Sequence, residues 1–356
     1  MNYEIYRDKL LEATVRSAAS DLHLTVGRKP ALRIDGELLA IEGEPELTPE
    51  NAHALIMTLL TPANQVRLEK RRDVDFSYNF RDRARFRVNV YYQRGYLAAA
   101  LRNIPQTILS IEELHLSAML HGFAKLKQGF LVVVGPAGHG KSTTLAAIID
   151  EVNHARADHI ITVEDPIEYL FVADRSNIDQ RELGLDTHSF AEALRSTLRQ
   201  DPDVIMVGEM RDAETISTAI TAAETGHLVL TSLHTNSAAQ TIDRIIDTFP
   251  PQQQNQVRVQ LADTLVGVVS QRLVPAIGGG RIPAVEVMIT NHAIRTLIRE
   301  AKTHQINLVI ETSAEEGMMT LNRSLADLVK RNEITFESAA LWSLNAAELS
   351  MLLGKR

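Results

Sequence analysis

The chain has 356 residues, which suits two domains better than one, and its 45% hydrophobic and 23% charged residues are typical of an ordinary globular protein. The absence of cysteine excludes disulfides, thiolate zinc sites and cysteine catalysis. A formal net charge of −8 argues against a dedicated nucleic-acid-binding surface, and no apolar run approaches the length needed to span a bilayer.

Residues 1–102 are expected to form a small α/β domain. Residues 1–20 are charged and amphipathic and lack the apolar core of a signal peptide, so we expect a cytoplasmic protein. Arg85, Arg87 and Asn89 alternate with apolar residues and are expected on the solvent-facing side of a strand. The elements predicted from periodicity are a helix at 3–19, strands at 22–26, 74–80 and 85–90, and a hairpin with Asp35-Gly36 at its turn.

Residues 103–118 lack a clear period and contain a proline near their start, so we expect a linker there. Residues 119–356 alternate apolar strands with helices, the pattern of a parallel sheet covered on both faces, and their C-terminal part is predicted to be mostly helical. Because ligands bind at the carboxyl ends of parallel strands, the polar residues that follow each strand predict an active site at that edge. The strands are FLVVV (130–134), HIITV (159–163), DVIMV (203–207) and HLVLTSL (227–233).

The first of these strands leads into a phosphate-binding loop. Glycines at fixed positions let backbone N–H groups turn inward around phosphate oxygens, and the helix that follows points its positive end at the same anion. Lys141 would reach the β- and γ-phosphates, and Ser142 would supply an oxygen to Mg²⁺. The sequence therefore predicts an ATPase that binds ATP and Mg²⁺. The loop consists of Gly135, Pro136, Ala137, Gly138, His139, Gly140, Lys141, Ser142 and Thr143.

Glu209 follows the strand at 203–207. A carboxylate at that strand end is where such enzymes hold the residue that orients or deprotonates the attacking water. Gly208 stands where an aspartate is usual, which favours a role of Glu209 on water over a role on the metal. The alternative is a surface acid just past a strand.

Glu164, Asp165 and Glu168 form a second acidic group after the strand at 159–163, with Pro166 fixing the turn between them. They could hold the water shell of Mg²⁺, which keeps several waters and takes few direct protein ligands. Glu168 could instead be an acid at the start of a helix, favoured by the helix dipole.

His227 and His234 lie at the two ends of the run LVLTSL, and Thr235 and Asn236 follow. A lone strand histidine is more often a core residue, but this pair favours a sensor of the γ-phosphate. Further on, residues 285–301 contain a helix in which Ile294, Leu297, Ile298 and Ala301 share a face, with Arg295 and Arg299 beside it. By spacing alone, the apolar face of that helix packs on a core and its basic edge faces solvent.

Together these motifs resemble the secretion-ATPase superfamily, the hexameric motors of type II secretion and type IV pili. The resemblance covers nearly the whole chain, and HAIRTLIREAK is similar to the motif of the pilus retraction branch. The other matching segments are the phosphate loop GPAGHGKST, the acidic box VEDPIEY, the second strand motif RQDPDVIMVGEMRD and the histidine box TGHLVLTSLHTNSA.

The resemblance implies a PAS-like N-terminal domain, a RecA-like P-loop motor domain and a homohexamer with ATP between subunits. It also implies that Arg87 and Arg102 reach the nucleotide from the N-terminal domain, whereas spacing alone makes Arg87 a solvated charge. Arg195 and Arg211 match further arginines of the family. Two positions depart from the family, which usually has threonine and serine where Ala137 and His139 stand.

The function implied is disassembly of type IV pili, the retraction step of twitching motility, with an inner-membrane platform protein as partner and a paralogous retraction ATPase as a possible second one. The motor would act at the inner face of the cytoplasmic membrane at the pilus base, and no nucleic acid would be involved. An extension or secretion motor is disfavoured because the chain has no four-cysteine zinc module and no long N-terminal extension. An accessory, non-hydrolysing ring subunit and a RecA-like nucleic-acid motor are further alternatives, disfavoured respectively by intact Lys141, Ser142 and Glu209 and by the acidic charge.

Overall fold

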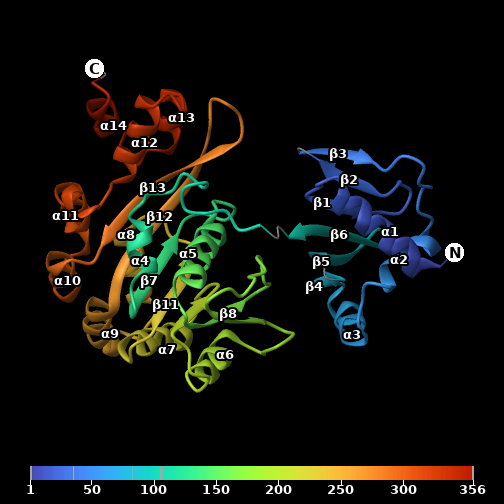
Figure 1. Cartoon of the computed structure of the whole chain (residues 1–356), viewed down its shortest axis with the longest axis horizontal. Coiled ribbons are helices and arrows are strands. Elements are labelled where there is room, and N and C mark those ends of the chain that lie inside the picture. Colours follow the sequence, from blue (N-terminus) through green and yellow to red (C-terminus); the bar gives the residue numbers. More distant parts are fainter. Residues whose placement is uncertain (1, 35, 82, 105–106, 355–356) are drawn as a thin grey trace. The chain divides into compact units, whose positions relative to one another are not determined.

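The computed structural model describes residues 2–34, 36–81, 83–104 and 107–354, which divide into two compact units (Figure 1). One unit comprises Met1–Thr107 with Glu168–Leu170, and the other comprises Ile108–Ile167 with Phe171–Arg356. Among the described residues, no helix combines the length and the apolar character that crossing a membrane requires.

In its described residues, the N-terminal unit is built on a six-stranded sheet in the order β3-β2-β1-β6-β5-β4, with every neighbouring pair antiparallel. The expected hairpin pairs Ile34 with Glu37, while Asp35 lies outside the described residues. The helices are α1 (Tyr3–Arg16), α2 (Pro49–Met57) and α3 (Pro62–Arg71), and the strands are β1 (Asp21–Leu24), β2 (Ala31–Ile34), β3 (Glu37–Ala40), β4 (Asp73–Phe80), β5 (Ala84–Gln93) and β6 (Tyr96–Ile104).

One face of this sheet is buried and the other is polar. Phe86, Val88 and Val90 of β5 are fully buried in the core beneath the helices, as the alternation predicts. Arg85 is an exception, because it is 7% exposed and its Nη1 donates to Asn79 Oδ1 at 3.2 Å. The prediction that Arg85 faces solvent is therefore wrong: its side chain is held against Asn79 of the neighbouring strand β4.

The C-terminal unit contains a seven-stranded sheet in the order β13-β12-β7-β11-β10-β8-β9 in its described residues. Its strands are β7 (Gly129–Val134), β8 (His159–Glu164), β9 (Asn177–Glu182), β10 (Val204–Val207), β11 (Leu228–Leu233), β12 (Leu265–Pro275) and β13 (Arg281–Ile289). Its helices are α4 (Leu120–Ala124), α5 (Lys141–Ala155), α6 (Phe190–Thr197), α7 (Ala213–Glu224), α8 (Ala238–Asp247), α9 (Pro251–Thr264), α10 (His292–Arg299), α11 (Ile306–Thr312), α12 (Leu321–Lys330), α13 (Phe336–Trp342) and α14 (Ala346–Leu352).

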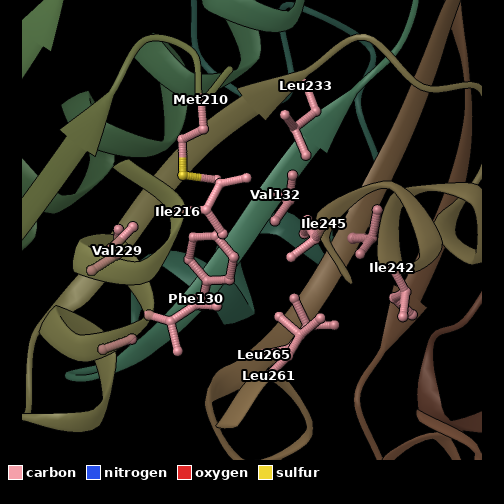
Figure 2. Close-up of a cluster of buried hydrophobic side chains, with 14 of the residues drawn as sticks. Phe130, Val132, Met210, Ile216, Val229, Leu233, Ile242, Ile245, Leu261 and Leu265 are labelled. Atoms are coloured by element: carbon pink, nitrogen blue, oxygen red, sulfur yellow. The ribbon is translucent and has the colours of Figure 1, made fainter. Parts of the chain in front are cut away.

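The four apolar runs form adjacent parallel strands, β7, β11, β10 and β8, as their composition predicts. They are apolar throughout because both faces are covered: alternate residues of β7 enter separate cores. Phe130, Val132 and Val134 pack toward α7, α8 and α9, whereas Leu131 and Val133 pack toward α4 and α5. Figure 2 shows the first core around Phe130, Val132, Met210, Ile216, Val229, Leu233, Ile242, Ile245, Leu261 and Leu265.

Three strands described in the C-terminal unit were not predicted, and neither was β6 of the N-terminal unit. β9 extends the sheet beyond β8, and β12 and β13 form an antiparallel pair in which β12 also pairs in parallel with β7. The C-terminal part thus contains the expected helices and, in addition, a long hairpin against the strand that leads into the phosphate loop. The expected helix within 285–301 is α10, whose Ile294 and Ile298 are buried, while Ala301 lies beyond its end with a φ of 57°.

Candidate active site

The phosphate loop turns directly out of β7 and into α5. Gly135, Gly138 and Gly140 have φ values of 149°, 75° and 80°, which residues with a side chain rarely adopt. Gly135 also has no room for a side chain, because an added Cβ would lie 2.3 Å from the carbonyl oxygen of Gln271. These glycines let the backbone curve as a loop that wraps phosphate oxygens must.

Lys141 is the first residue of α5 and is 8% exposed. Its Nζ donates to the carbonyl oxygens of Gly135 and Pro136, each at 2.9 Å, and lies 3.5 Å from His234 Nδ1. The ammonium group is therefore held inside the curve of the loop. A phosphate there would meet this cation together with the N-terminus of α5.

The ends of β10 and β11 bring Glu209 and His234 to the same edge. Glu209 Oε2 lies 3.7 Å from His234 Nε2, and Glu209 Oε1 forms an ion pair with Arg211 Nη2 at 2.7 Å. His234 thus stands between the ammonium group of Lys141 and the carboxylate of Glu209. The three residues thus lie together at the carboxyl edge of the sheet, where the sequence predicted an active site.

The pKa of His234 is lowered, first by burial and next by the positive charge of Lys141, while the carboxylate of Glu209 opposes the shift. A neutral imidazole between a cation and a carboxylate can accept a proton or a hydrogen bond on one nitrogen and donate on the other. An open pocket of about 560 Å³ adjoins Glu209 and His234 and is also lined by Arg211, Thr235, Arg244 and Thr248.

Glu164 is the last residue of β8 and is 6% exposed. One of its oxygens accepts from Thr162 Oγ1 of the same strand at 2.6 Å and from Gln180 Nε2 of β9 at 3.2 Å, and both bonds fix the carboxylate. Asp165 and Glu168 are exposed. No helix begins at Glu168, so the alternative that it is a helix-start acid is wrong.

His227 lies at the amino end of β11, opposite the end that carries His234. Its carbonyl oxygen accepts from Gly129 N at the start of β7, and its Nδ1 lies 2.8 Å from the Ala222 carbonyl oxygen. The six residues of β11 therefore separate the two histidines. Of the two histidines, His234 lies beside Lys141 and Glu209, and His227 lies at the other end of the strand; a joint role of both in sensing phosphate stays a prediction.

Arg87 and Arg102 lie in the N-terminal unit. They are directly opposite each other on β5 and β6, so their side chains emerge on the same face of the sheet. Arg87 pairs with Asp75 at 2.7 Å, and Arg102 Nε donates to Asp21 Oδ1 at 3.1 Å. Both guanidinium groups are substantially exposed, with 40% and 69% of the side-chain surface accessible.

The hairpin of β12 and β13 supplies further residues near the site that sequence reasoning missed. Ser270 Oγ donates to the Asn236 carbonyl oxygen at 3.0 Å, and Glu286 accepts from Ala238 N at 2.7 Å, so both hold the segment after His234. Gln271 contacts the phosphate loop. The signal was hidden because β12 ends at Pro275 and the glycines at 278–280 follow before β13 begins, a composition typical of a loop.

Residues 3–339 match the family described as type II/IV secretion system protein. The chain belongs to this family. The likeness confirms the predicted α/β fold, a P-loop ATPase domain preceded by a smaller α/β domain.

Among its relatives in this family is the Pseudomonas aeruginosa protein named "Type IV pilus retractation ATPase PilT", which is 45% identical over 331 residues that cover 93% of this chain and 96% of the relative. A Neisseria gonorrhoeae protein named "Twitching motility protein" is 44% identical over 322 residues, covering 90% of this chain and 86% of the relative. A crystal structure described as the pilus retraction motor PilT with bound ADP has a TM-score of 0.90 and 47% identity, with 97% of this chain and 98% of that chain covered.

Replacing Lys141 by alanine is expected to abolish ATP hydrolysis, because the β- and γ-phosphates lose the cation held inside the loop. Phosphate release by the purified full-length protein measures the effect. The matched control is Lys302→Ala, which removes an exposed lysine paired with Glu300 and should leave the rate near that of the wild type. Near-normal phosphate release by Lys141→Ala would contradict the role of this loop.

The same variant should raise the pKa of His234. In the native protein His234 binds fewer protons than in the unfolded chain, so its contribution to stability is lost as the pH falls below the usual value of 6.5 toward its lowered pKa. Removing the ammonium group 3.5 Å away lessens this shift. NMR titration of labelled histidines would show a higher midpoint for His234 in Lys141→Ala, with the exposed His154 as the unchanged reference. An unchanged His234 midpoint would refute the electrostatic link.

Proposed function

We propose that this protein is a Mg²⁺-dependent ATP hydrolase that powers the disassembly of type IV pili, and hence retraction and twitching motility. The observation that carries the proposal is the meeting of Lys141, His234 and Glu209 at the carboxyl edge of the sheet, beside a complete phosphate loop. The near full-length similarity to the Pseudomonas aeruginosa and Neisseria gonorrhoeae relatives supports the choice of pilus retraction over other uses of this fold.

The phosphates of ATP would lie in the loop formed by residues 135–143, with backbone N–H groups and Lys141 neutralising their charge. Ser142 would hold Mg²⁺ together with phosphate oxygens and water. This arrangement agrees with the described part of the chain, in which no group of three or more histidine or acidic side chains is placed to hold a metal by itself. Glu164, Asp165 and Glu168 would act on the outer water shell of the metal.

Glu209 would orient or deprotonate the water that attacks the γ-phosphate. Its carboxylate is 18% exposed and is held from two sides by Arg211 and His234. His234 would sense the γ-phosphate, since it contacts both Glu209 and the lysine that binds the phosphates. Such positioning of a water and stabilisation of charge are the main sources of catalysis in phosphoryl transfer.

Arg87 and Arg102 would supply positive charge to the nucleotide from the N-terminal unit. The shared face of β5 and β6 and the exposure of both side chains leave them accessible to an anion. Each is paired with a carboxylate, so a phosphate would replace Asp75 or Asp21 as its partner. An arginine supplied from a separate domain stabilises the transition state only when that domain closes on the nucleotide.

The protein would work as a homohexamer with ATP between subunits, in contact with an inner-membrane pilus platform protein and with a paralogous retraction ATPase as a possible second partner. It would act in the cytoplasm at the inner face of the membrane, and it would use no nucleic acid. An extension or secretion motor and a non-hydrolysing ring subunit remain the competing functions. The intact Lys141, Ser142 and Glu209 speak against a non-hydrolysing subunit.

Deletion of the gene tests the direction of the motor. Loss of a retraction motor should give cells with excess pili and no twitching motility, because pili continue to extend and are not retracted. Cells without pili would instead identify an extension motor, and unchanged pili would exclude both.

Glu209→Gln should still bind ATP but hydrolyse it on the order of 10²-fold more slowly, because the amide keeps the shape and loses the base. Nucleotide binding and phosphate release should be measured on the same preparation. Glu214→Gln is the matched control, since it changes an exposed glutamate on α7 that pairs with Arg195 of α6. If Glu209→Gln binds no nucleotide, Glu209 has a structural or metal role and not the one assigned to it.

Replacing Arg295 and Arg299 of α10 by alanine should leave ATP hydrolysis within about twofold but abolish motility. Both arginines contact Asp263 near the end of α9. Arg295 donates to its backbone carbonyl oxygen at 3.0 Å, and Arg299 pairs with its carboxylate. They therefore hold α10, which carries the segment similar to the retraction motif, against α9 and not against the phosphate loop. Motility and pilus number would be compared with those of Arg331→Ala, an exposed arginine paired with Glu333. Wild-type motility in the double variant would show that these arginines are not needed for retraction.

A further inference from the structure

The phosphate loop is held from outside by β12. Gln271 Nε2 donates to the backbone carbonyl oxygen of His139 at 2.9 Å, and Gln271 Oε1 accepts from Thr144 Oγ1 at 2.6 Å. One side-chain amide therefore joins the middle of the loop to the first turn of α5. At 3% exposure Gln271 lies away from competing water.

The contact is close on both sides of the loop. A Cβ on Gly140 would lie 2.7 Å from Gln271 Nε2, and a Cβ on Gly135 would lie 2.3 Å from the Gln271 carbonyl oxygen. Glycine at these positions therefore serves two needs, a positive φ and a close approach to β12. The P-loop pattern explains the first need but not the second.

The side chain of His139 adds a second attachment to the same strand. Its Nδ1 accepts from Leu273 N at 2.9 Å, and its ring meets that of Trp342 on α13 edge to face, with centroids 5.2 Å apart. A histidine with Nδ1 as acceptor is neutral, which agrees with its lowered pKa, caused first by burial and then by Arg281, Arg272 and Lys141.

We propose that Gln271 is a positioning residue that, with His139 as a second attachment, holds the phosphate loop in its phosphate-binding shape. The inference rests on the proposed binding of ATP at this loop. Without the amide, Thr144 Oγ1 and the His139 carbonyl oxygen lose their partner and the loop gains freedom that nucleotide binding must remove. Affinity for nucleotide then falls, because a ligand that selects one loop conformation binds in proportion to its population.

The test is ADP binding to the full-length protein by calorimetry, with ATP turnover measured in parallel. Gln271→Met keeps the length of the side chain and removes both hydrogen bonds, and it should weaken ADP binding about tenfold. KM for ATP should rise while kcat changes much less, because the loop binds ground state and transition state alike. The matched control is Gln260→Met on α9, which breaks a hydrogen bond to Glu224 far from the loop and should bind ADP as the wild type does.

Thr144→Val tests the same hydrogen bond from its donor side by replacing one hydroxyl group with a methyl group. It should weaken ADP binding several-fold, and combined with Gln271→Met it should add little, because both variants break the same hydrogen bond. Wild-type ADP affinity in either single variant would overturn the proposal, and if Gln271→Met fails to fold, Thr144→Val decides. Failure of the wild-type protein itself to bind ADP would instead refute the proposed function.

Discussion

The close approach between Gly135 and the backbone of Gln271 is the constraint on which the candidate site depends. β7 must end where the loop begins, and β12 must lie directly beside it, because the parallel pairing of the two strands continues as far as Val134 opposite Ser270. A side chain at Gly135 would push the strands apart. The sheet order therefore decides the shape of the loop as much as the loop's own glycines do.

The hairpin of β12 and β13 links three parts of the C-terminal unit. Gln271 contacts the phosphate loop, Ser270 and Glu286 hold the segment after His234, and β13 runs almost directly into α10, which Asn291 caps by accepting from Ile294 N at 3.1 Å. β12, β13 and α10 thus follow one another along the chain beside the phosphate loop.

Sequence reasoning predicted the elements whose signal is local. The strands β7, β8, β10 and β11 are apolar along their whole length because both faces are covered, and the loop that follows β7 has a distinctive spacing. β12 and β13 were missed because Pro275 and the glycines at 278–280 resemble loop composition, and because β7, the strand that joins β12 to the sheet, is distant in the sequence. Burial of Arg85 likewise depends on a partner in another strand, Asn79 of β4.

The central claim is that hydrolysis at the Lys141, His234 and Glu209 edge drives pilus retraction. Live imaging of labelled pili in cells whose sole copy of the gene carries Glu209→Gln tests it most directly. The account predicts that pili extend normally and do not retract, since the variant binds ATP and cannot hydrolyse it. Retraction at wild-type speed in these cells would contradict the account.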